Sequence, residues 1–315
     1  MNDQRIQSVG GIARDPFRRP TRSKRFAEGG SVSKLNPFRF DTVPDGAVED
    51  FLRDGYIAVH DAMTDEAREG LIDEIVTSRP VADFLSSPPE DRERPTSRAT
   101  SGANKTSTYF VRPWNDRGPW GHALVDAPLV KALLAATIEP GYHFCHSALN
   151  LAPRGSDRVR FHQDHHHWKH ENPVNLAERH RYYIQILYYP NGFKRGDRSL
   201  SVIPGSHRVA PTEEATPEAM LSGAFNQEVG RSLECLHLEL PPGSFVYLNA
   251  RMFHGVEPKP LDSPQAYRIF TIDIFKESGP PHRYTQEIPS DWMDRADEHR
   301  SQMFDREAYT EESWK

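Results

Sequence analysis

From residue 142 onward the chain is a succession of short runs that are β-branched, aromatic or alternating in polarity. These runs cover 142–151, 159–165, 181–189, 200–203, 236–240, 244–249 and 267–275. Turn-forming pairs such as Asn191-Gly192, Pro204-Gly205 and Pro242-Gly243 separate several of them. Because many short strands can bury their apolar faces only against one another, this part of the chain predicts a β-sandwich or jelly roll.

The preceding residues predict helices around this β-structure. Residues 47–54 carry apolar side chains at helical spacing, 56–59 is a strand-like run, and Thr64 is a suitable N-cap for a second helix. A further helix is expected over 124–137. The stretch 79–119 is rich in Pro, Ser and Arg and is expected to be a long loop, either a lid or a surface excursion. The whole pattern predicts an α+β fold: a β-sandwich or jelly roll with helices packed on one face.

Both ends of the chain are expected to be extensions. Residues 1–40 contain nine Lys/Arg and three Asp/Glu. A nucleic-acid arm would suit this charge but lacks a supporting motif, and the acidic residues weaken the alternative of a mitochondrial transit segment. We favour an arm over 1–44 that packs on its own domain or on a partner subunit, where it could join a homo-oligomer. A domain over 45–276 and a charged extension over 277–315 that packs on the same domain complete the predicted organisation.

Composition narrows the expected partners. The net charge is −6, and the two cysteines, Cys145 and Cys235, offer neither a disulfide framework nor a thiolate zinc motif. No apolar run reaches the ~18 residues that a membrane span requires. We therefore expect a cytoplasmic protein that binds a small-molecule substrate, with neither nucleic acid nor a membrane as a partner.

The run 159–165 carries a metal-ligand pattern. Side chains alternate along a strand, so His162 and Asp164 are expected on one face. His254, which follows the run 244–249, is the best candidate for a third ligand. Two imidazoles and one carboxylate form the facial triad of non-haem Fe(II) sites, which leaves coordination positions open.

The same segment allows a weaker interpretation, because five histidines crowd it: His162, His165, His166, His167 and His170. Such a tract could bind zinc or nickel loosely at a surface. His166 would share the His162 face if the strand continued. We expect the four later histidines to be non-ligands.

Arg268 forms a second pattern. It shares its strand face, which is expected to be buried, with Phe270, Ile272 and Ile274. A buried guanidinium needs an anionic partner, because burying it unpaired is costly. That partner is either the far carboxylate of a metal-chelating dicarboxylate or an internal carboxylate such as Asp273 or Glu257.

On these residues the chain resembles the phytanoyl-CoA dioxygenase family of Fe(II)/2-oxoglutarate-dependent oxygenases, over residues 45–276. The matching segments are Phe51-Leu52-Arg53-Asp54-Gly55-Tyr56-Ile57, His162-Gln163-Asp164, Val202-Ile203-Pro204-Gly205-Ser206-His207, Pro242-Gly243-Ser244, Phe253-His254-Gly255 and Arg268. His-Gln-Asp and Pro-Gly-Ser-His are fairly specific together, although neither is so alone.

The resemblance implies a double-stranded β-helix fold of the jelly-roll, cupin-like type, and it implies a set of site residues. The catalytic residues and Fe(II) ligands would be His162, Asp164 and His254. Arg268 would anchor 2-oxoglutarate, the cosubstrate that is consumed together with O2, and Gln185 would be a further cosubstrate contact.

Two other positions bear on the resemblance. His207 follows the family motif and is expected to be structural. Val256 stands where many relatives carry a Ser or Thr, two residues after the distal histidine, so a hydroxyl contact to the cosubstrate is missing there.

The function that the resemblance implies is a dioxygenase that hydroxylates or otherwise oxidises a small metabolite or natural-product intermediate, releasing succinate and CO2. Loops over 79–119, 165–180 and 209–235 are expected to shape its pocket. Two alternatives stay open. One is a cupin-like iron dioxygenase or isomerase that does not use 2-oxoglutarate, and the other is a non-catalytic metal-binding jelly-roll protein.

Overall fold

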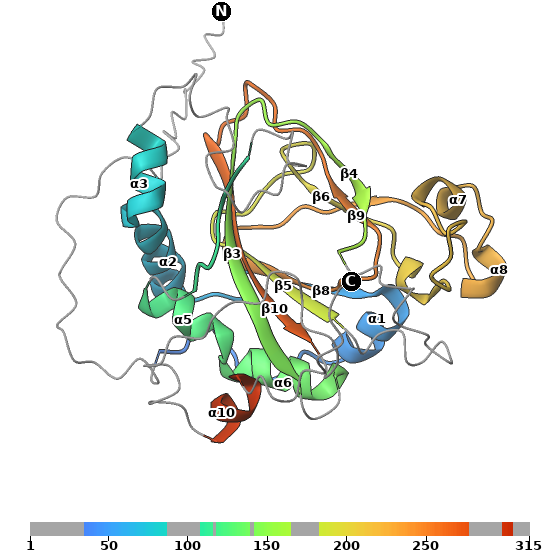
Figure 1. Cartoon of the computed structure of the whole chain (residues 1–315), viewed down its shortest axis with the longest axis horizontal. Helices are drawn as coiled ribbons and strands as arrows, with labels where there is room; N and C mark the ends of the chain where they lie inside the picture. The colour runs from blue at the N-terminus through green and yellow to red at the C-terminus, as the bar shows by residue number, and fades with distance from the viewer. Residues whose placement is uncertain are drawn as a thin grey trace, which may run out of the picture.

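Two antiparallel sheets face each other in the computed structural model, which describes residues 35–86, 108–115, 118–138, 142–164, 183–276 and 298–304 (Figure 1). The larger sheet has six strands, in the order β1 (Tyr56–Val59), β8 (Ser244–Asn249), β5 (Tyr183–Tyr189), β10 (Tyr267–Lys276), β3 (His143–Pro153) and β2 (Tyr109–Val111). The smaller sheet has four, in the order β4 (Val159–His162), β9 (His254–Val256), β6 (Leu200–Val202) and β7 (Leu236–His237). The predicted α+β jelly-roll class is confirmed.

The helices cover the outer face of the larger sheet. They are α1 (Ala47–Asp54), α2 (Asp65–Thr77), α3 (Arg79–Ser86), α5 (Pro119–Val125), α6 (Pro128–Thr137) and α10 (Glu298–Phe304) (Figure 1). Two further short helices, α7 (Pro217–Leu221) and α8 (Asn226–Val229), lie beyond the smaller sheet. None of the described helices has the length and apolar character needed to cross a membrane.

The larger sheet separates two apolar cores, and β10 shows how. Ile269 and Phe275 point toward the helices, whereas Ile272 and Ile274 point into the space between the two sheets. Leu200 and Val202 of β6 enter the inner core from the opposite side. Alternation along β10 therefore decides which side chains can reach the interior of the sandwich.

Several expected elements are confirmed by the structure. Thr64 caps α2, because its hydroxyl accepts the backbone N–H of Ala67 at 3.1 Å. Gly55 ends α1 with φ at 85°, in the left-handed region that glycine tolerates best. Strands β1 and β8 have the predicted bounds.

The long loop predicted over 79–119 is wrong in part. Helix α3 occupies its beginning, where Val81 and Phe84 are buried, and β2 and the start of α5 occupy its end. The Phe84 ring stacks on Tyr109 with ring centroids 4.3 Å apart, so tertiary packing overrides the polar composition of the stretch. Residues 87–107 lie outside the described part.

The single helix predicted over 124–137 is also wrong. The structure has two helices there, because Pro128 occupies the first turn of α6 and cannot continue α5.

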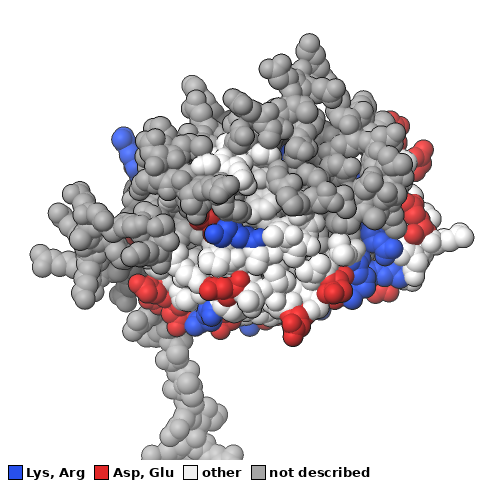
Figure 2. Space-filling view, turned by 90° about the horizontal axis from the view of Figure 1, so that it is seen from below, with Lys and Arg blue, Asp and Glu red and all other residues white. Residues whose placement is uncertain are grey.

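Residues at both chain ends pack on the domain. Phe38 is buried, with its ring centroid 5.4 Å from that of Phe245, and Phe304 of α10 lies 5.8 Å from Phe144 of β3. Residues 1–34 and 305–315 are not described, so the role of the arm and the domain bounds stay predictions. On the face shown in Figure 2, acidic and basic side chains are interspersed.

Candidate metal centre

The two predicted histidines meet across the smaller sheet. His162 ends β4, His254 begins β9, and the two residues are register partners. Their ring centroids lie 4.4 Å apart, and His254 is buried whereas His162 is partly exposed. Residues 92 positions apart in sequence are thus brought to one point by a single antiparallel pairing.

Asp164 completes the cluster, although it is not in the strand as predicted. β4 ends at His162, and Asp164 follows in a bend, held by its backbone N–H, which donates to the carbonyl of Ala250 at 3.0 Å. Its Oδ1 lies 3.6 Å from His162 Nε2 and its Oδ2 lies 3.3 Å from His254 Nε2. One ligand atom from each of the three residues lies within 4.8 Å of the others, so the group could hold a metal ion.

Backbone carbonyls orient both imidazoles. His162 Nδ1 lies 2.9 Å from the carbonyl of Arg160, and His254 Nδ1 lies 3.0 Å from that of Met252. A carbonyl accepts only, so each Nδ1 carries the proton in these contacts. Both Nε2 atoms therefore face Asp164, and each would offer a lone pair to a metal ion as a neutral imidazole.

The charges within the cluster reinforce one another. Burial by itself raises the pKa of Asp164, but the charge of His162 and the hydrogen bond with His254 outweigh it and hold this pKa far below its ordinary range. Burial by itself lowers the pKa of His254, but Asp164 outweighs it and the pKa of His254 is raised. An ionised carboxylate between two imidazoles is the charge distribution that a divalent cation satisfies.

Gln185 contacts the carboxylate rather than open space. It lies on β5, and its side-chain amide donates to Asp164 Oδ2. The structure thus gives Gln185 a partner that the sequence did not indicate, and its predicted contact with a cosubstrate stays a prediction.

The Pro-Gly-Ser-His motif supports the distal ligand. Ser206 Oγ accepts the backbone N–H of Phe253 at 2.9 Å, and Ile203 N–H donates to the Phe253 carbonyl at 2.9 Å. These bonds fix the residue directly before His254. The ring of His207 lies against Gly55, where an added Cβ would come within 2.5 Å of Nδ1, so His207 joins the motif to the end of α1.

Arg268 lies deep in the interior. Its exposed fraction is 1%, its Nη1 donates to the carbonyl of Arg198 at 2.7 Å, and within the described ranges its Nε has no partner. Three aromatic rings surround its guanidinium, with centroids 5.0–5.9 Å away: Phe270, Tyr189 and Phe193. Burial lowers the pKa of Arg268, and Tyr189 and Asp197 oppose that shift.

The ion pairs with Asp273 or Glu257 that could have compensated the buried charge of Arg268 are not formed. Asp273 accepts a hydrogen bond from Asn115 on the helix side of the sheet, and Glu257 lies 3.3 Å from His237. Among the residues that the structure describes, no carboxylate lies within ion-pair distance of Arg268.

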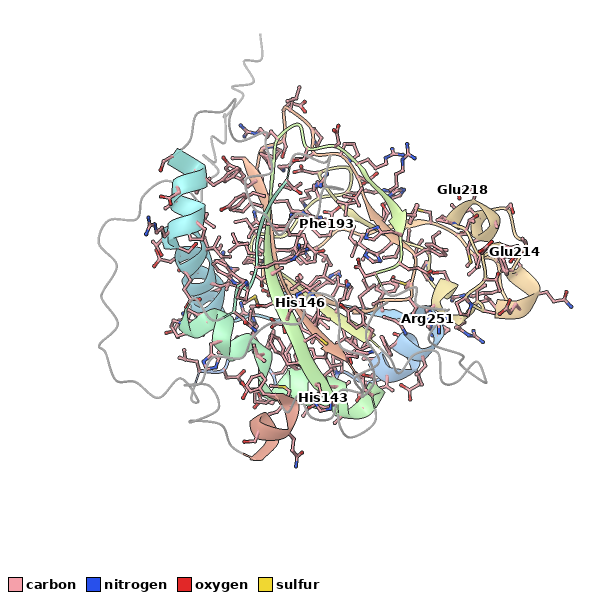
Figure 3. All side chains as sticks on the ribbon, in the orientation of Figure 1. His143, His146, Phe193, Glu214, Glu218 and Arg251 are labelled. Atoms are coloured by element: carbon pink, nitrogen blue, oxygen red, sulfur yellow. The ribbon has the colours of Figure 1, made fainter. Side chains whose placement is uncertain are left out.

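Two interior polar residues, Tyr189 and His146, are not among the predicted site residues. Tyr189 is fully buried, and within the described part of the chain its hydroxyl has no hydrogen-bond partner. Alternation over 181–189 places it on the Gln185 face, which is a signal that could have found it. His146 of β3 faces the same interior, in one row with Ile274 and Gln185 across three strands (Figure 3). No sequence pattern singled out His146.

The residues that hold His254 and Arg268 lie a short distance apart along β6 and the connection before it. Val202 is the register partner of His254, and Arg198, whose carbonyl holds Arg268, precedes Val202 by four residues. Four residues span at most roughly 13 Å of extended chain. This bound limits the separation of Arg198 and Val202, and the buried guanidinium of Arg268 lies at the Arg198 end. His165, His166, His167, His170 and Trp168 lie outside the described residues.

A jelly roll whose interior brings together two imidazoles and one carboxylate defines the class of cupin-like metal proteins. Within this class, the chain belongs to the phytanoyl-CoA dioxygenase (PhyH) family, whose model matches residues 51–259. The predicted family resemblance is thereby confirmed. A comparison with curated protein sequences finds no match.

Three solved structures illustrate the similarity of the fold. One is the non-heme alpha ketoglutarate dependent epimerase SnoN from nogalamycin biosynthesis, at 16% identity, with a TM-score of 0.52 over 74% of this chain and 82% of that chain. The carbocyclase SnoK from nogalamycin biosynthesis has 12% identity and a TM-score of 0.54 over 80% and 88%. HygX from Streptomyces hygroscopicus has 13% identity and a TM-score of 0.51 over 75% and 88%.

At these identities the likeness shows the fold. HygX was solved with nickel and 2-oxoglutarate bound, and SnoN with Fe3+, alpha ketoglutarate and nogalamycin RO. The metal and cosubstrate class predicted from the sequence agrees with what these relatives hold.

Proposed function

We propose that this chain is a non-haem Fe(II)- and 2-oxoglutarate-dependent dioxygenase that oxidises a small metabolite or natural-product intermediate. The observation that carries the proposal is the pairing of the His162, Asp164 and His254 cluster with a buried guanidinium, that of Arg268, in the same interior. A metal site alone would suit many cupin-like proteins. Among the residues that the structure describes, no carboxylate forms an ion pair with Arg268, and this favours a dicarboxylate cosubstrate as its partner.

Each residue has a role that its contacts support. His162, Asp164 and His254 would hold the iron, with the backbone carbonyls of Arg160 and Met252 fixing both imidazoles. When bound, iron and 2-oxoglutarate supply the oxidising chemistry, in which O2 is consumed and succinate and CO2 are released.

Arg268 would bind the cosubstrate in the interior between the two sheets. Arg268 would make charge-assisted hydrogen bonds to its distal carboxylate, and the buried hydroxyl of Tyr189 is available as a neutral donor. The rings of Phe193 and Phe270 exclude water around this contact and strengthen it. Tyr189 would therefore supply the hydroxyl that Val256 does not offer.

The substrate class rests on the relatives. SnoN and SnoK are described as an epimerase and a carbocyclase from nogalamycin biosynthesis, which are reactions on small natural products. Hydroxylation is the default outcome for this chain, and the relatives support other oxidative outcomes on a similar fold.

An anaerobic titration tests the proposal. Fe(II) is added to the protein, followed by 2-oxoglutarate, and the visible charge-transfer band of the iron chelate is recorded. The band is expected with the unchanged chain and absent with Asp164→Ala. A chain that binds Fe(II) tightly but gives no band would contradict the proposal and favour a cupin-like iron enzyme that does not use 2-oxoglutarate. A chain that binds no Fe(II) would favour a non-catalytic jelly-roll protein.

A further inference from the structure

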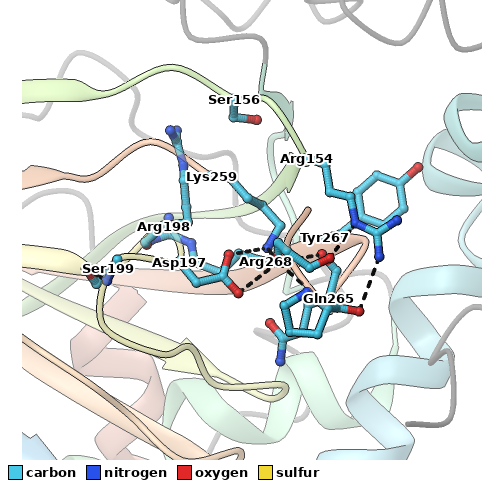
Figure 4. Close-up of polar contacts among 12 residues, drawn as sticks. Arg154, Ser156, Asp197, Arg198, Ser199, Lys259, Gln265, Tyr267 and Arg268 are labelled. Atoms are coloured by element: carbon cyan, nitrogen blue, oxygen red, sulfur yellow. Dashed lines mark hydrogen bonds and ion pairs between the residues drawn. The ribbon is translucent and has the colours of Figure 1, made fainter. Parts of the chain in front are cut away.

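A buried lysine lies beside the predicted cosubstrate anchor. Lys259 belongs to the connection between β9 and β10, and its side chain is fully shielded from solvent. Its Nζ lies 2.8 Å from Asp197 Oδ1 and donates to Ser263 Oγ at 2.8 Å (Figure 4). Lysine is seldom buried completely unless it is paired, and Asp197 is the partner that allows Lys259 to be buried here.

Both oxygens of Asp197 are occupied in this arrangement. Oδ1 accepts from Lys259, and Oδ2 accepts from the Ser263 hydroxyl at 2.8 Å. Asp197 is therefore fully engaged within this group and makes no ion pair with Arg268 among the described residues.

The group adjoins Arg268 through the backbone. Asp197 directly precedes Arg198, whose carbonyl accepts Nη1 of Arg268 at 2.7 Å (Figure 4). Burial lowers the pKa of Lys259, and the positive charge of Arg268 lowers it further against the opposing effect of Asp197. Asp197 in turn raises the pKa of Arg268. The three charges are close enough to act on one another.

The charges in this group do not balance. Lys259, Arg198 and Arg268 are buried cations, and Asp197 is the carboxylate that acts on Lys259 and Arg268. Because Asp197 is hydrogen-bonded to Lys259, the positive charge of Arg198 and Arg268 is left in surplus. A buried surplus charge is costly, and an incoming carboxylate relieves it.

We infer that Lys259 holds Asp197 away from Arg268 and thereby keeps the guanidinium available for the distal carboxylate of 2-oxoglutarate. This inference rests on the proposed function and adds a positioning residue, Lys259, outside the metal centre. Without Lys259, Asp197 would be a buried carboxylate without its ion-pair partner, and Arg268 is a buried cation on which it already acts. The internal carboxylate would then compete with the ligand carboxylate for the same donors.

The test is a 2-oxoglutarate titration of the Fe(II)-loaded full chain, followed by the charge-transfer band under anaerobic conditions. Lys259→Met keeps the length and apolar stem of the side chain but removes its charge. It is expected to raise the Kd for 2-oxoglutarate roughly tenfold or more, as expected for the loss of a close charge pair. Fe(II) affinity should not change, because the metal ligands are untouched.

A rescue variant separates competition from simple damage. In Lys259→Met combined with Asp197→Asn, the competing charge is gone, and Kd should return to within about threefold of the unchanged chain, because independent losses would add instead. The double variant no longer buries a carboxylate without its lysine, so its thermal stability should be no lower than that of the single variant. Ser263→Ala, which frees Asp197 Oδ2 only, should give an intermediate Kd if Lys259→Met does not fold.

Lys194→Met is the matched control. Lys194 lies in the connection between β5 and β6, as Asp197 does, and pairs with Glu239. Its side chain is 79% exposed, so its loss should leave the Kd for 2-oxoglutarate unchanged. A Kd for Lys259→Met equal to that of the unchanged chain would overturn the inference, as would a double variant as weak as the single one. Absence of the band in the unchanged chain would instead contradict the proposed function.

Discussion

Gln185 donates its side-chain amide to Asp164, so a strand of the larger sheet holds the carboxylate that follows a strand of the smaller sheet. The metal centre is thus built across the sandwich: two imidazoles on paired strands of one sheet, and the support of their carboxylate on the other. Because Asp164 lies in a bend beyond β4, its orientation depends on this amide and on its own backbone contact.

We therefore expect Gln185→Ala to weaken Fe(II) binding by about 10- to 100-fold, the usual effect of removing a hydrogen bond to a metal ligand. A chelator-competition titration measures it. Gln265→Ala is the matched control, because Gln265 donates one amide hydrogen bond at 2.8 Å to the carbonyl of Asn191, away from the metal centre. Equal Fe(II) affinities for the two variants would contradict a supporting role for Gln185.

Asp164→Ala is expected to abolish succinate release. The change removes the one carboxylate of the cluster and leaves two imidazoles, which bind Fe(II) weakly and without charge compensation. Succinate formed from 2-oxoglutarate under O2 is the measurement. Circular dichroism must show an unchanged fold, and iron-dependent succinate release by the folded variant would refute the assignment of the ligand set.

Arg268→Ala and Tyr189→Phe should raise the requirement for 2-oxoglutarate while leaving Fe(II) binding intact. Arg268→Ala removes the buried cation, and we expect that 2-oxoglutarate no longer saturates the Fe(II)-loaded protein.

Tyr189→Phe removes one hydroxyl without altering the ring that lies beside the guanidinium. We expect the Kd for 2-oxoglutarate to rise about tenfold, the value of a hydrogen bond to a charged group. A Tyr189→Phe variant with unchanged Kd would mean that the hydroxyl does not contact the cosubstrate.

The sequence predicted the ligand set more reliably than the geometry around it. His162, Asp164 and His254 came from residue type, spacing and family motifs, and the structure brings all three within ligand distance. Strand alternation did not foresee that Asp164 follows the strand, because a bend can present a side chain on the same side as a strand does. The support from Gln185 depends on the packing of two sheets, which no local pattern encodes.

The surroundings of Arg268 show the same limit. Alternation along 267–275 correctly placed Arg268 on the buried face. Which carboxylates approach Arg268 depends on how the connections between strands pack at one end of the sandwich. These connections meet only in the folded chain. The sequence therefore left Asp273 and Glu257 as possible partners, and the structure directs both elsewhere.

Gly55→Ala should destabilise the fold through a contact as well as through backbone strain. Gly55 has φ at 85°, and an added Cβ would lie 2.5 Å from Nδ1 of His207. The left-handed conformation alone costs about 1–2 kcal/mol for a residue with a Cβ. Gly46→Ala controls for that cost, because Gly46 has φ at 75° with nothing within 4 Å of the added atom. Denaturant unfolding should show a larger loss for Gly55→Ala, and equal losses would exclude a contribution from His207.

Glu74 predicts a pH dependence of stability. Its Oε1 accepts the backbone N–H of Trp120 at 2.6 Å and its Oε2 that of Gly121 at 3.0 Å, at the beginning of α5. Burial raises the pKa of Glu74 from 4.5 to about 7, against the opposing effect of these two hydrogen bonds. Between those pH values the folded chain binds a proton that the unfolded chain has released. The contribution of Glu74 to stability is therefore fully present below pH 4.5 and is lost as the pH rises through about 7.

Glu74→Gln replaces the protonated carboxyl with a neutral group of the same shape and removes this titration. The free energy of unfolding of the variant, measured relative to the unchanged chain, should therefore increase as the pH rises from 4.5 to 7. Glu69→Gln, a change at a carboxyl on the same helix whose side chain is 72% exposed, controls for the loss of one negative charge. A difference for Glu74→Gln that stays constant across this pH interval would show that Glu74 is ionised throughout, because only a proton bound in the folded state gives the difference a slope.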